Sequence, residues 1–123
     1  MRKRQDWERR LHEFLTENKL RPFRWGDWDC CIFTNAAVYA MTGEHLIPKE
    51  LDWHDEASAQ EAIKSYGKTL GKSIYRAALA KELIKVPANA VRKGDVLVIR
   101  EDGKQVAAIC DGSAALCPSD GGY

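Results

Sequence analysis

Residues 23–31 read Phe-Arg-Trp-Gly-Asp-Trp-Asp-Cys-Cys, and residues 32–41 continue them as Ile-Phe-Thr-Asn-Ala-Ala-Val-Tyr-Ala-Met. The second run is apolar on nearly every side and predicts a buried central helix that ends at Gly43. Asp27 or Asp29 can cap its N-terminus. Cys30 then lies in the first turn, where the positive end of the helix dipole favours a thiolate. Because the thiolate is the nucleophilic form of cysteine, Cys30 is the first candidate for a catalytic residue.

Helical spacing of apolar residues recurs on both sides of this segment. An amphipathic helix of about four turns begins near Trp7 and stops before Arg21-Pro22, where a compact aromatic loop follows. A short helix is expected over Glu56–Tyr66, a break over Gly67–Gly71, and a further helix that extends to Val86-Pro87.

The period changes after Pro87. Strands are expected over Asp95–Arg100, Val106–Cys110 and Ala114–Cys117, separated by turns at Asp102-Gly103 and Asp111-Gly112. Helices followed by an antiparallel meander indicate the α+β class. At 123 residues, the chain is expected to form a single domain over residues 1–123.

Composition excludes several functional classes. Lys and Arg number 19 against 18 Asp and Glu, so no global field points to nucleic acid or to an anionic membrane. The basic start, residues 1–4, is followed by acidic residues and by no apolar run, so we expect no secretory signal and synthesis in a cytoplasm. No segment approaches the roughly 20 apolar residues of a membrane span.

Four cysteines leave one cofactor alternative open. An even number without an export signal is weak support for disulfides. One alternative is an iron–sulfur cluster, although the usual Cys-x2-Cys spacings are absent. It would require the sheet to pack on the helix and bring together Cys30, Cys31, Cys110 and Cys117. Otherwise we expect no cofactor.

Two other patterns are weaker. Gly67-Lys68-Thr69 and Gly71-Lys72-Ser73 resemble the end of a phosphate-binding loop, but the earlier glycine of that motif is missing from both. Asp52, His54 and Asp55, with His45 before them, match no standard zinc spacing and are better interpreted as a solvated loop packed by a tryptophan.

The motifs resemble the papain-like cell-wall peptidases of the NlpC superfamily. In those enzymes a Trp-Gly loop leads into an Asp-Cys pair whose cysteine is the nucleophile, and a later Gly-Asp-apolar strand precedes a strand that starts with the catalytic histidine. The corresponding residues here are Trp25-Gly26, Asp29-Cys30 and Gly94-Asp95-Val96. The resemblance implies a papain-like, NlpC-type fold, with loop residues Trp25, Gly26 and Trp28 beside the substrate.

A closer resemblance is to a small family of uncharacterised phage and prophage tail-associated proteins. They share the form Pro-Phe-x-Trp-Gly-x-x-Asp-Cys-Cys, followed by an alanine-rich helix and Thr-Gly, which here are residues 22–31 and 42–43. The resemblance extends from Trp7 to about Gly112. It implies a virion protein, located in the phage tail and in contact with other tail proteins and with peptidoglycan.

The peptidase pattern breaks at the general base. The second strand of the peptidases begins His-Val-Gly-Ile, and the matching residues 105–108 here are Gln-Val-Ala-Ala. Gln105 cannot take a proton from a thiol. The third polar position corresponds to Leu116 or Cys117. His45 or His54 would have to move in as a substitute base.

Two functions of different classes follow from the resemblance. The first is a catalytically degenerate structural component of the tail tip or of tail assembly. The second is an active cysteine endopeptidase or amidase that cleaves peptidoglycan stem peptides as the phage enters its host, with Cys30 as nucleophile and an unrecognised base. General acid–base help is worth roughly 10²–10⁴-fold in rate, so a lone Cys30 makes the first function the favoured prediction.

Overall fold

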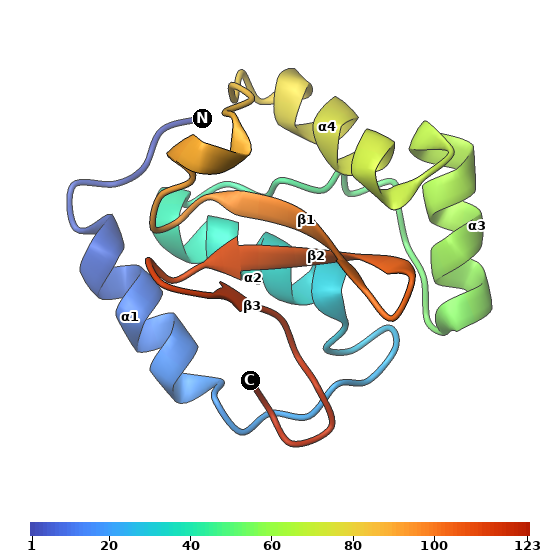
Figure 1. Ribbon diagram of the computed structural model, residues 1–123. Coiled ribbons are helices and arrows are strands. Elements are labelled where there is room, and N and C mark those ends of the chain that lie inside the picture. The colour runs from blue at the N-terminus through green and yellow to red at the C-terminus, as the bar shows by residue number, and fades with distance from the viewer.

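The computed structural model describes all residues from Met1 to Tyr123 (Figure 1). Its helices are α1 (Trp7–Glu17), α2 (Cys30–Thr42), α3 (Glu56–Gly67) and α4 (Leu70–Ala80), with a short 3₁₀ helix at Ala88–Ala90. The strands β1 (Val96–Glu101), β2 (Lys104–Cys110) and β3 (Ala115–Leu116) form one antiparallel sheet in the order β1-β2-β3. The predicted α+β class is confirmed.

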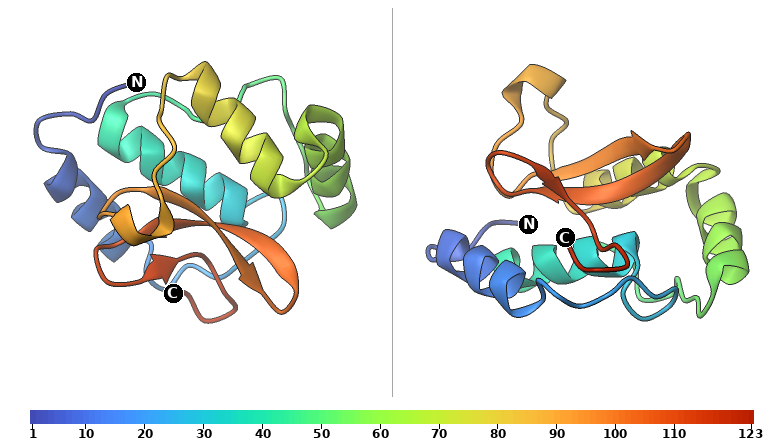
Figure 2. Two further views of the ribbon diagram at one scale, coloured as in Figure 1. Left: turned by 45° about the horizontal axis from the view of Figure 1, so that its top comes forward. Right: turned by 60° about the horizontal axis from the view of Figure 1, so that its bottom comes forward.

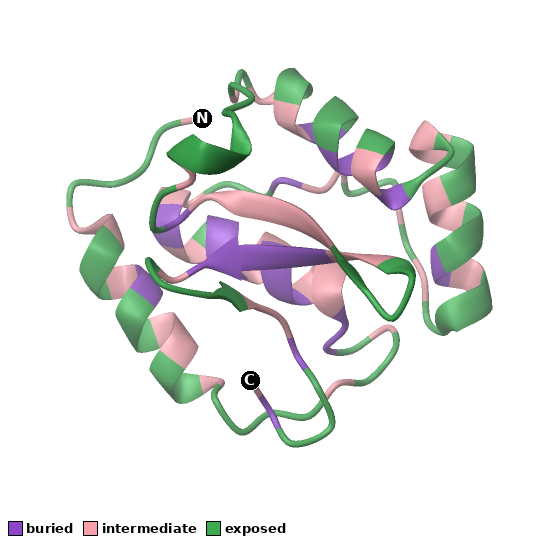
Figure 3. Cartoon of the chain, viewed as in Figure 1, coloured by how far each residue is buried: buried purple, intermediate pink, exposed green.

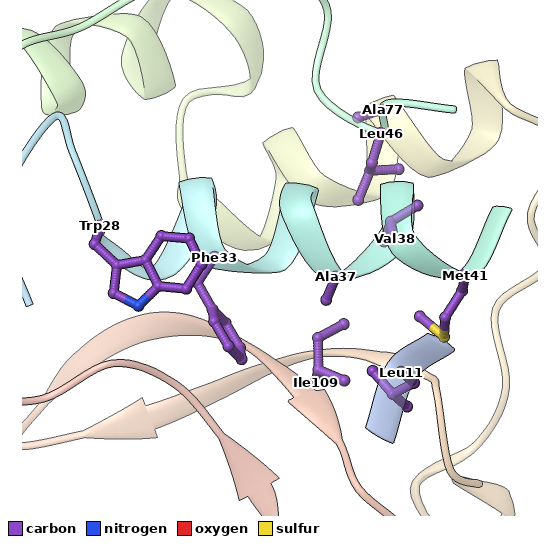
Figure 4. Packing of buried hydrophobic residues seen from close by; sticks show 9 residues of the cluster. All are labelled: Leu11, Trp28, Phe33, Ala37, Val38, Met41, Leu46, Ala77 and Ile109. Carbon is purple, nitrogen blue, oxygen red and sulfur yellow. The ribbon is translucent and has the colours of Figure 1, made fainter. Parts of the chain in front are cut away.

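Helix α2 is the central buried helix that the sequence predicts. Asp29, rather than Asp27, caps it, because its carboxylate accepts a hydrogen bond of 2.9 Å from the backbone N–H of Ile32. Gly43 ends it in the left-handed conformation, at φ 80°. The helix packs against α1 and β2. Figure 4 shows its inward side chains meeting those of neighbouring elements in one core, which comprises Leu11, Trp28, Phe33, Ala37, Val38, Met41, Leu46, Ala77 and Ile109.

The sheet lies over α2 and α4. Residues two apart on β2 face the same side, so Ala107 packs against Leu70 and Ile74 of α4, while Ile109 packs into the core around α2. The β1–β2 turn falls at Asp102-Gly103, as predicted, with positive φ at both residues. Burial is concentrated along β2 and the inner sides of the helices (Figure 3).

Helix α4 differs from the prediction at both ends. It begins at Leu70, inside the expected break, because the Thr69 hydroxyl caps it by accepting from the N–H of Lys72. It ends at Ala80, well before Val86-Pro87, since Glu82 adopts φ 63° and the next amide bonds back to Ala78. Helix ends of this kind usually have glycine at the residue with positive φ. Glu82 takes that place here, so the sequence gives no signal for the end of the helix.

Helix α3 stands at the edge of the molecule. It packs mainly on α4, and Figure 2 shows it apart from α2 and the sheet. Ala59 is its one buried residue. An open space lined by side chains therefore remains on its inner side, and this space adjoins the start of α2.

The last residues return to the first helix. The Tyr123 hydroxyl donates a hydrogen bond to the carbonyl of Leu15, and its ring centroid lies 5.4 Å from that of Phe33. None of the helices combines the length and the apolar character needed to cross a bilayer.

Candidate functional site

Asp29 is the structural anchor of the site. It is 1 % exposed, and its carboxylate accepts three hydrogen bonds. The donors are the backbone N–H of Ile32 at 2.9 Å, the backbone N–H of Gly26 at 3.1 Å and the indole N–H of Trp53 at 2.7 Å. Asp29 therefore joins the aromatic loop, the start of α2 and the segment before α3.

Gly26 lets two segments approach closely. Its φ is 77°, and a Cβ added there would lie 2.6 Å from the backbone oxygen of His54. Only glycine fits this contact without a shift of the backbone. The position accounts for the Trp-Gly pair in structural terms, because the loop rests directly on residues 53–55.

Cys30 occupies the first position of α2, directly after the cap. The pKa of its thiol is lowered, because the Cys31 thiol forms a hydrogen bond with the Cys30 sulfur and the backbone of Ala107 adds a second one; burial opposes the shift. The pKa of Cys31 is raised by the same hydrogen bond and by burial. Of the adjacent pair, Cys30 is thus the thiol that ionises first.

A large apolar pocket opens beside Cys30. We call it the Cys30 pocket; its volume is about 670 Å³, within the range of small-molecule sites. Its walls come from the start of α2, the aromatic loop, residues 47–53, the inner side of α3, the first half of α4 and the β1–β2 hairpin. Its apolar lining includes Trp25, Leu51, Trp53, Ile63, Tyr66 and Ile74.

Gln105 lines the same pocket but is engaged elsewhere. Its side-chain oxygen accepts a hydrogen bond of 3.0 Å from the backbone N–H of Gly71, in the first turn of α4. Gln105 lies two residues before Ala107, whose backbone reaches the Cys30 sulfur. Residues two apart on a strand point to the same face of the sheet, so Gln105 and Ala107 share a face. The structure thus brings Cys30 and Gln105 to one pocket. The hydrogen bond from Gly71 to Gln105 links the first turn of α4 to β2.

No histidine lines the Cys30 pocket. His54 is exposed and its ring contacts Asp55 at 3.5 Å, while the His45 ring stacks on Tyr39 at 4.6 Å between centroids. Of the two residues expected at the third position, Leu116 and Cys117, it is Cys117 that lines the pocket. Its pKa is raised to about 11 by burial and by Glu101. Neither histidine is therefore placed to act on Cys30.

The two tryptophans of the loop have different environments. Trp25 lines the pocket and is 36 % exposed. Trp28 is 3 % exposed and contacts Phe33 edge-to-face in the core, with ring centroids 5.6 Å apart. Of the residues expected beside a substrate, Trp25 lies in the pocket, whereas Trp28 packs the core and Gly26 turns the loop.

The cysteines do not form a metal centre. All four are free thiols, and no group of three or more His, Cys, Asp or Glu side chains is arranged to hold a metal ion. Cys110 lies at the far end of β2 from the pocket that contains Cys30, Cys31 and Cys117. The direction of β2 therefore keeps Cys110 away from the other three cysteines, and the structure gives the four-cysteine iron–sulfur alternative no support.

Comparison with known proteins identifies a family. A family model described as "Domain of unknown function (DUF6950)" matches residues 2–123, almost the whole chain. The chain belongs to this family. No curated protein and no solved structure matches it significantly. The site of this DUF6950 chain is therefore interpreted from its own geometry, and the resemblance to NlpC enzymes and phage tail proteins stays a prediction.

Sequence reasoning missed one residue of the DUF6950 site. The sequence indicates only a packing role for Trp53, yet its indole N–H completes the hydrogen bonds of Asp29. An aromatic residue within an otherwise polar loop was the available signal. The acceptor, Asp29, precedes Trp53 by 24 residues, so no local spacing pattern connects the two residues.

Proposed function

We propose that this protein is a catalytically degenerate, papain-like domain that serves as a structural component of a phage tail, at the tail tip or in its assembly. The loss of catalytic activity is inferred from one observation, which is the glutamine at position 105. By the resemblance, Gln105 stands at the position of the family's histidine; it lines the same pocket as Cys30, and its side-chain oxygen accepts a hydrogen bond from the N–H of Gly71. The assignment to a phage tail rests on the resemblance of residues 22–31 to the motif of phage tail-associated proteins.

The NlpC-type fold is supported by the relative placement of its parts. A capped cysteine begins the central helix, the backbone of β2 reaches that cysteine at Ala107, and a pocket opens beside Cys30. This is the arrangement that a thiol hydrolase needs to present a nucleophile. Without a base in reach, the arrangement holds an ionisable thiol and lacks proton transfer.

A second candidate, an active cysteine endopeptidase or amidase, is favoured by one observation. The lowered pKa of Cys30 favours the thiolate, which is the nucleophilic form, and its sulfur lies beside a pocket large enough for a peptide segment.

Both candidates are tested in one assay. Purified protein is incubated with peptidoglycan, and released stem peptides are measured by mass spectrometry beside an active NlpC enzyme as positive control. The structural proposal predicts no release above the Cys30→Ala control. Release that disappears in Cys30→Ala would overturn it in favour of the peptidase.

The tail location needs its own experiment. Particles released from the host strain that encodes the chain are purified on a density gradient and their proteins identified by mass spectrometry. We expect the chain at a low, fixed ratio to the tail tube protein. Its absence from infectious particles and from tail-assembly intermediates would contradict this location.

A further inference from the structure

Three of the four cysteines of this chain line a single cavity. Cys30 and Cys31 enter the Cys30 pocket from the start of α2, and Cys117 enters it from the segment that follows β3. These three residues are partly exposed, whereas Cys110 is 8 % exposed and does not line the pocket. Structural cysteines are usually buried and inert, so three accessible free thiols in one place indicate thiol chemistry.

The sheet topology explains how Cys117 comes to the same pocket as Cys30. Strand β3 runs antiparallel to β2 with Leu116 opposite Ile109, so the chain after Leu116 runs back along β2 toward Ala107. The backbone of Ala107 is the part of β2 that reaches the Cys30 sulfur. In Figure 1 the chain leaves β3 toward the end of the sheet at which α2 begins. Burial raises the pKa of Cys117 and the charge on Cys30 raises it further, so the two sulfurs lie within electrostatic range.

The two thiols differ in how readily they ionise. The hydrogen bond from the Cys31 thiol lowers the pKa of Cys30. Burial raises the pKa of Cys117 to about 11, and the Glu101 carboxylate, with Oε2 at 3.9 Å from the Cys117 sulfur, acts in the same direction. Of the two, Cys30 therefore supplies the thiolate, which attacks electrophiles, and Cys117 stays protonated until a later step.

A thiolate without a general base can still react with oxidants. Cleavage of an amide requires a proton for the leaving amine, and no histidine lines the pocket to supply it. Attack on the O–O bond of a hydroperoxide requires no such group, because the departing alkoxide takes its proton from water. Oxidation of an accessible cysteine with a low pKa is thus a reaction that this site can perform as it stands.

The lining of the pocket indicates the class of hydroperoxide. Beside Cys30 and Cys31 the wall is apolar, with Leu70 and Ile74 of α4 and Ile63 of α3 in contact around them. The charged residues of the lining have both signs, so they select neither an anion nor a cation: Glu56, Lys68, Arg100, Glu101 and Lys104. An uncharged hydroperoxide with an apolar group matches such a lining better than hydrogen peroxide does.

We propose that Cys30 and Cys117 are a redox pair, in which an apolar hydroperoxide oxidises Cys30 in the pocket and Cys117 then closes a disulfide with it. In the first step the Cys30 thiolate attacks the terminal oxygen of ROOH. The O–O bond breaks, Cys30 becomes a sulfenic acid, and the alkoxide takes a proton from water and leaves as ROH. In the second step the Cys117 sulfur displaces the hydroxyl group, which leaves as water with the thiol proton. Two thiols and ROOH thus give one disulfide, ROH and water.

The geometry of adjacent residues excludes Cys31 from the second step. The Cα atoms of neighbouring residues are about 3.8 Å apart, whereas a disulfide spans about 4.4–6.8 Å between Cα atoms. Cys30 and Cys31 both belong to the first turn of α2, so a bond between them would break the start of that helix. Cys117 follows the last residue of β3 and lies outside regular structure. It can therefore approach Cys30 without the loss of a helix or a strand.

The bond would join two walls of the Cys30 pocket, the start of α2 and the segment after β3, and would narrow the space between them. The redox pair does not rest on the function proposed above. Peptide release and the location of the chain are both assayed without an oxidant, so either result leaves the disulfide to be decided by its own experiment.

Peptide mapping of the wild-type chain tests the proposal directly. The reduced protein is treated with one equivalent of cumene hydroperoxide, the remaining thiols are alkylated, and disulfide-linked peptides are identified by mass spectrometry. We expect a peptide that links Cys30 to Cys117 as the main product, with Cys110 still a free thiol. A main product that links Cys30 to Cys31 or to Cys110, a disulfide between two chains, or a Cys30 that stays reduced would each overturn the proposal.

Single substitutions separate the two steps, once circular dichroism establishes that each variant keeps the fold. Cys117→Ala should oxidise at Cys30 and stop at the sulfenic acid, which dimedone traps. Cys31→Ala should still form the disulfide, although more slowly because Cys30 loses a hydrogen bond, and this variant assigns the bond to Cys30 and not to its neighbour. Cys110→Ala is the matched control and should behave like the wild type. Disulfide formation by Cys30→Ala at the wild-type rate would overturn the proposal, as would a Cys117→Ala without trapped sulfenic acid.

A comparison of oxidants tests the class of substrate. The rates of Cys30 oxidation by cumene hydroperoxide and by hydrogen peroxide are each divided by the rate for free glutathione, which has no pocket. We expect the resulting ratio for cumene hydroperoxide to be several-fold higher, because its ring enters the apolar lining. Equal ratios, or a preference for hydrogen peroxide, would overturn the assignment of an apolar hydroperoxide.

Discussion

The indole N–H of Trp53 donates a hydrogen bond of 2.7 Å to the buried carboxylate of Asp29, which caps the helix that begins with Cys30. The bond links the segment before α3 to the start of the central helix. Because Asp29 is 1 % exposed, water cannot replace a donor that is removed. The position of Cys30 therefore depends on a tryptophan well outside the cysteine motif.

Replacement of Trp53 by phenylalanine should destabilise the fold. Trp53→Phe removes the N–H and leaves part of a buried carboxylate unpaired, which costs about 1.5–3 kcal/mol in the free energy of unfolding. Urea denaturation measures the loss. Trp25→Phe is the control: its ring is 36 % exposed, and we expect a change within about 0.5 kcal/mol. Equal losses in the two variants would contradict a special role for the Trp53 bond.

Gly26 and Gly103 offer a matched pair of substitutions. Both have φ 77°, but a Cβ at Gly26 meets the backbone of His54 whereas a Cβ at Gly103 meets nothing within 4 Å. Gly103→Ala should cost about 1–2 kcal/mol for the left-handed conformation alone. Gly26→Ala should cost more, because backbone must also move. Thermal unfolding of both variants measures the difference, and equal melting temperatures would show that the close contact is unimportant.

Gln105 should contribute to stability through α4. Gln105→Leu keeps the size of the side chain but leaves the N–H of Gly71 without its acceptor, at a cost of about 1 kcal/mol. Gln105→Glu retains an acceptor and should lose less. Gln5→Leu, at an exposed position just before α1, is the control for replacing glutamine by leucine. Chemical denaturation compares the three, and an unchanged Gln105→Leu would remove the assigned role.

The reactivity of Cys30 should depend on pH in a defined direction. Its lowered pKa means that the thiolate appears, and alkylation by iodoacetamide accelerates, below the ordinary cysteine value of about 8.5. Cys31→Ala removes the main stabilising hydrogen bond, so the midpoint should move to higher pH. Cys117, whose pKa is raised to about 11, should react with a midpoint well above that of Cys30. Mass spectrometry of each cysteine after timed labelling gives the profiles.

A reversed order would contradict the geometry. If Cys31 or Cys117 titrated before Cys30, the first turn of α2 would not be the thiolate-favouring position. If Cys31→Ala left the Cys30 midpoint unchanged, the hydrogen bond between the adjacent thiols would not be its cause.

Prediction from sequence succeeded where local chemistry decides the structure. The start and end of α2 follow from a capping aspartate and a glycine, and the β1–β2 turn follows from Asp102-Gly103. It failed at α4, where Lys68 and Glu82 adopt positive φ without being glycine. Lys68 ends α3 and Glu82 follows α4, and neither residue type favours a positive φ, so local propensity gives no signal for these ends.

The candidate site divides in the same way. The placement of Cys30 behind a cap was predictable, because it depends on neighbours in the chain. The attachment of Gln105 to Gly71, the bond from Trp53 to Asp29 and the separation of Cys110 from the other cysteines were not. Each depends on how elements distant in sequence pack.

The charge distribution shows why both levels are needed. The segments with opposite charge are visible in the sequence once residues 44–61 and 68–93 are counted separately, but the near-neutral total conceals them. Only the fold shows where these charges lie: Lys68 and Glu56 line the same apolar pocket, and Arg76 stacks on the Tyr66 ring of α3.

The sequence by itself determined the α+β class, the capped central helix and the thiol at its first position, because short-range hydrogen bonding and apolar periodicity specify them. Tertiary structure alone decided what surrounds that thiol: a pocket behind α3, a glutamine turned toward α4 and no histidine within the lining. Those surroundings arise from contacts between distant segments, and such contacts depend on the packing of the whole chain and not on the propensities of any one stretch.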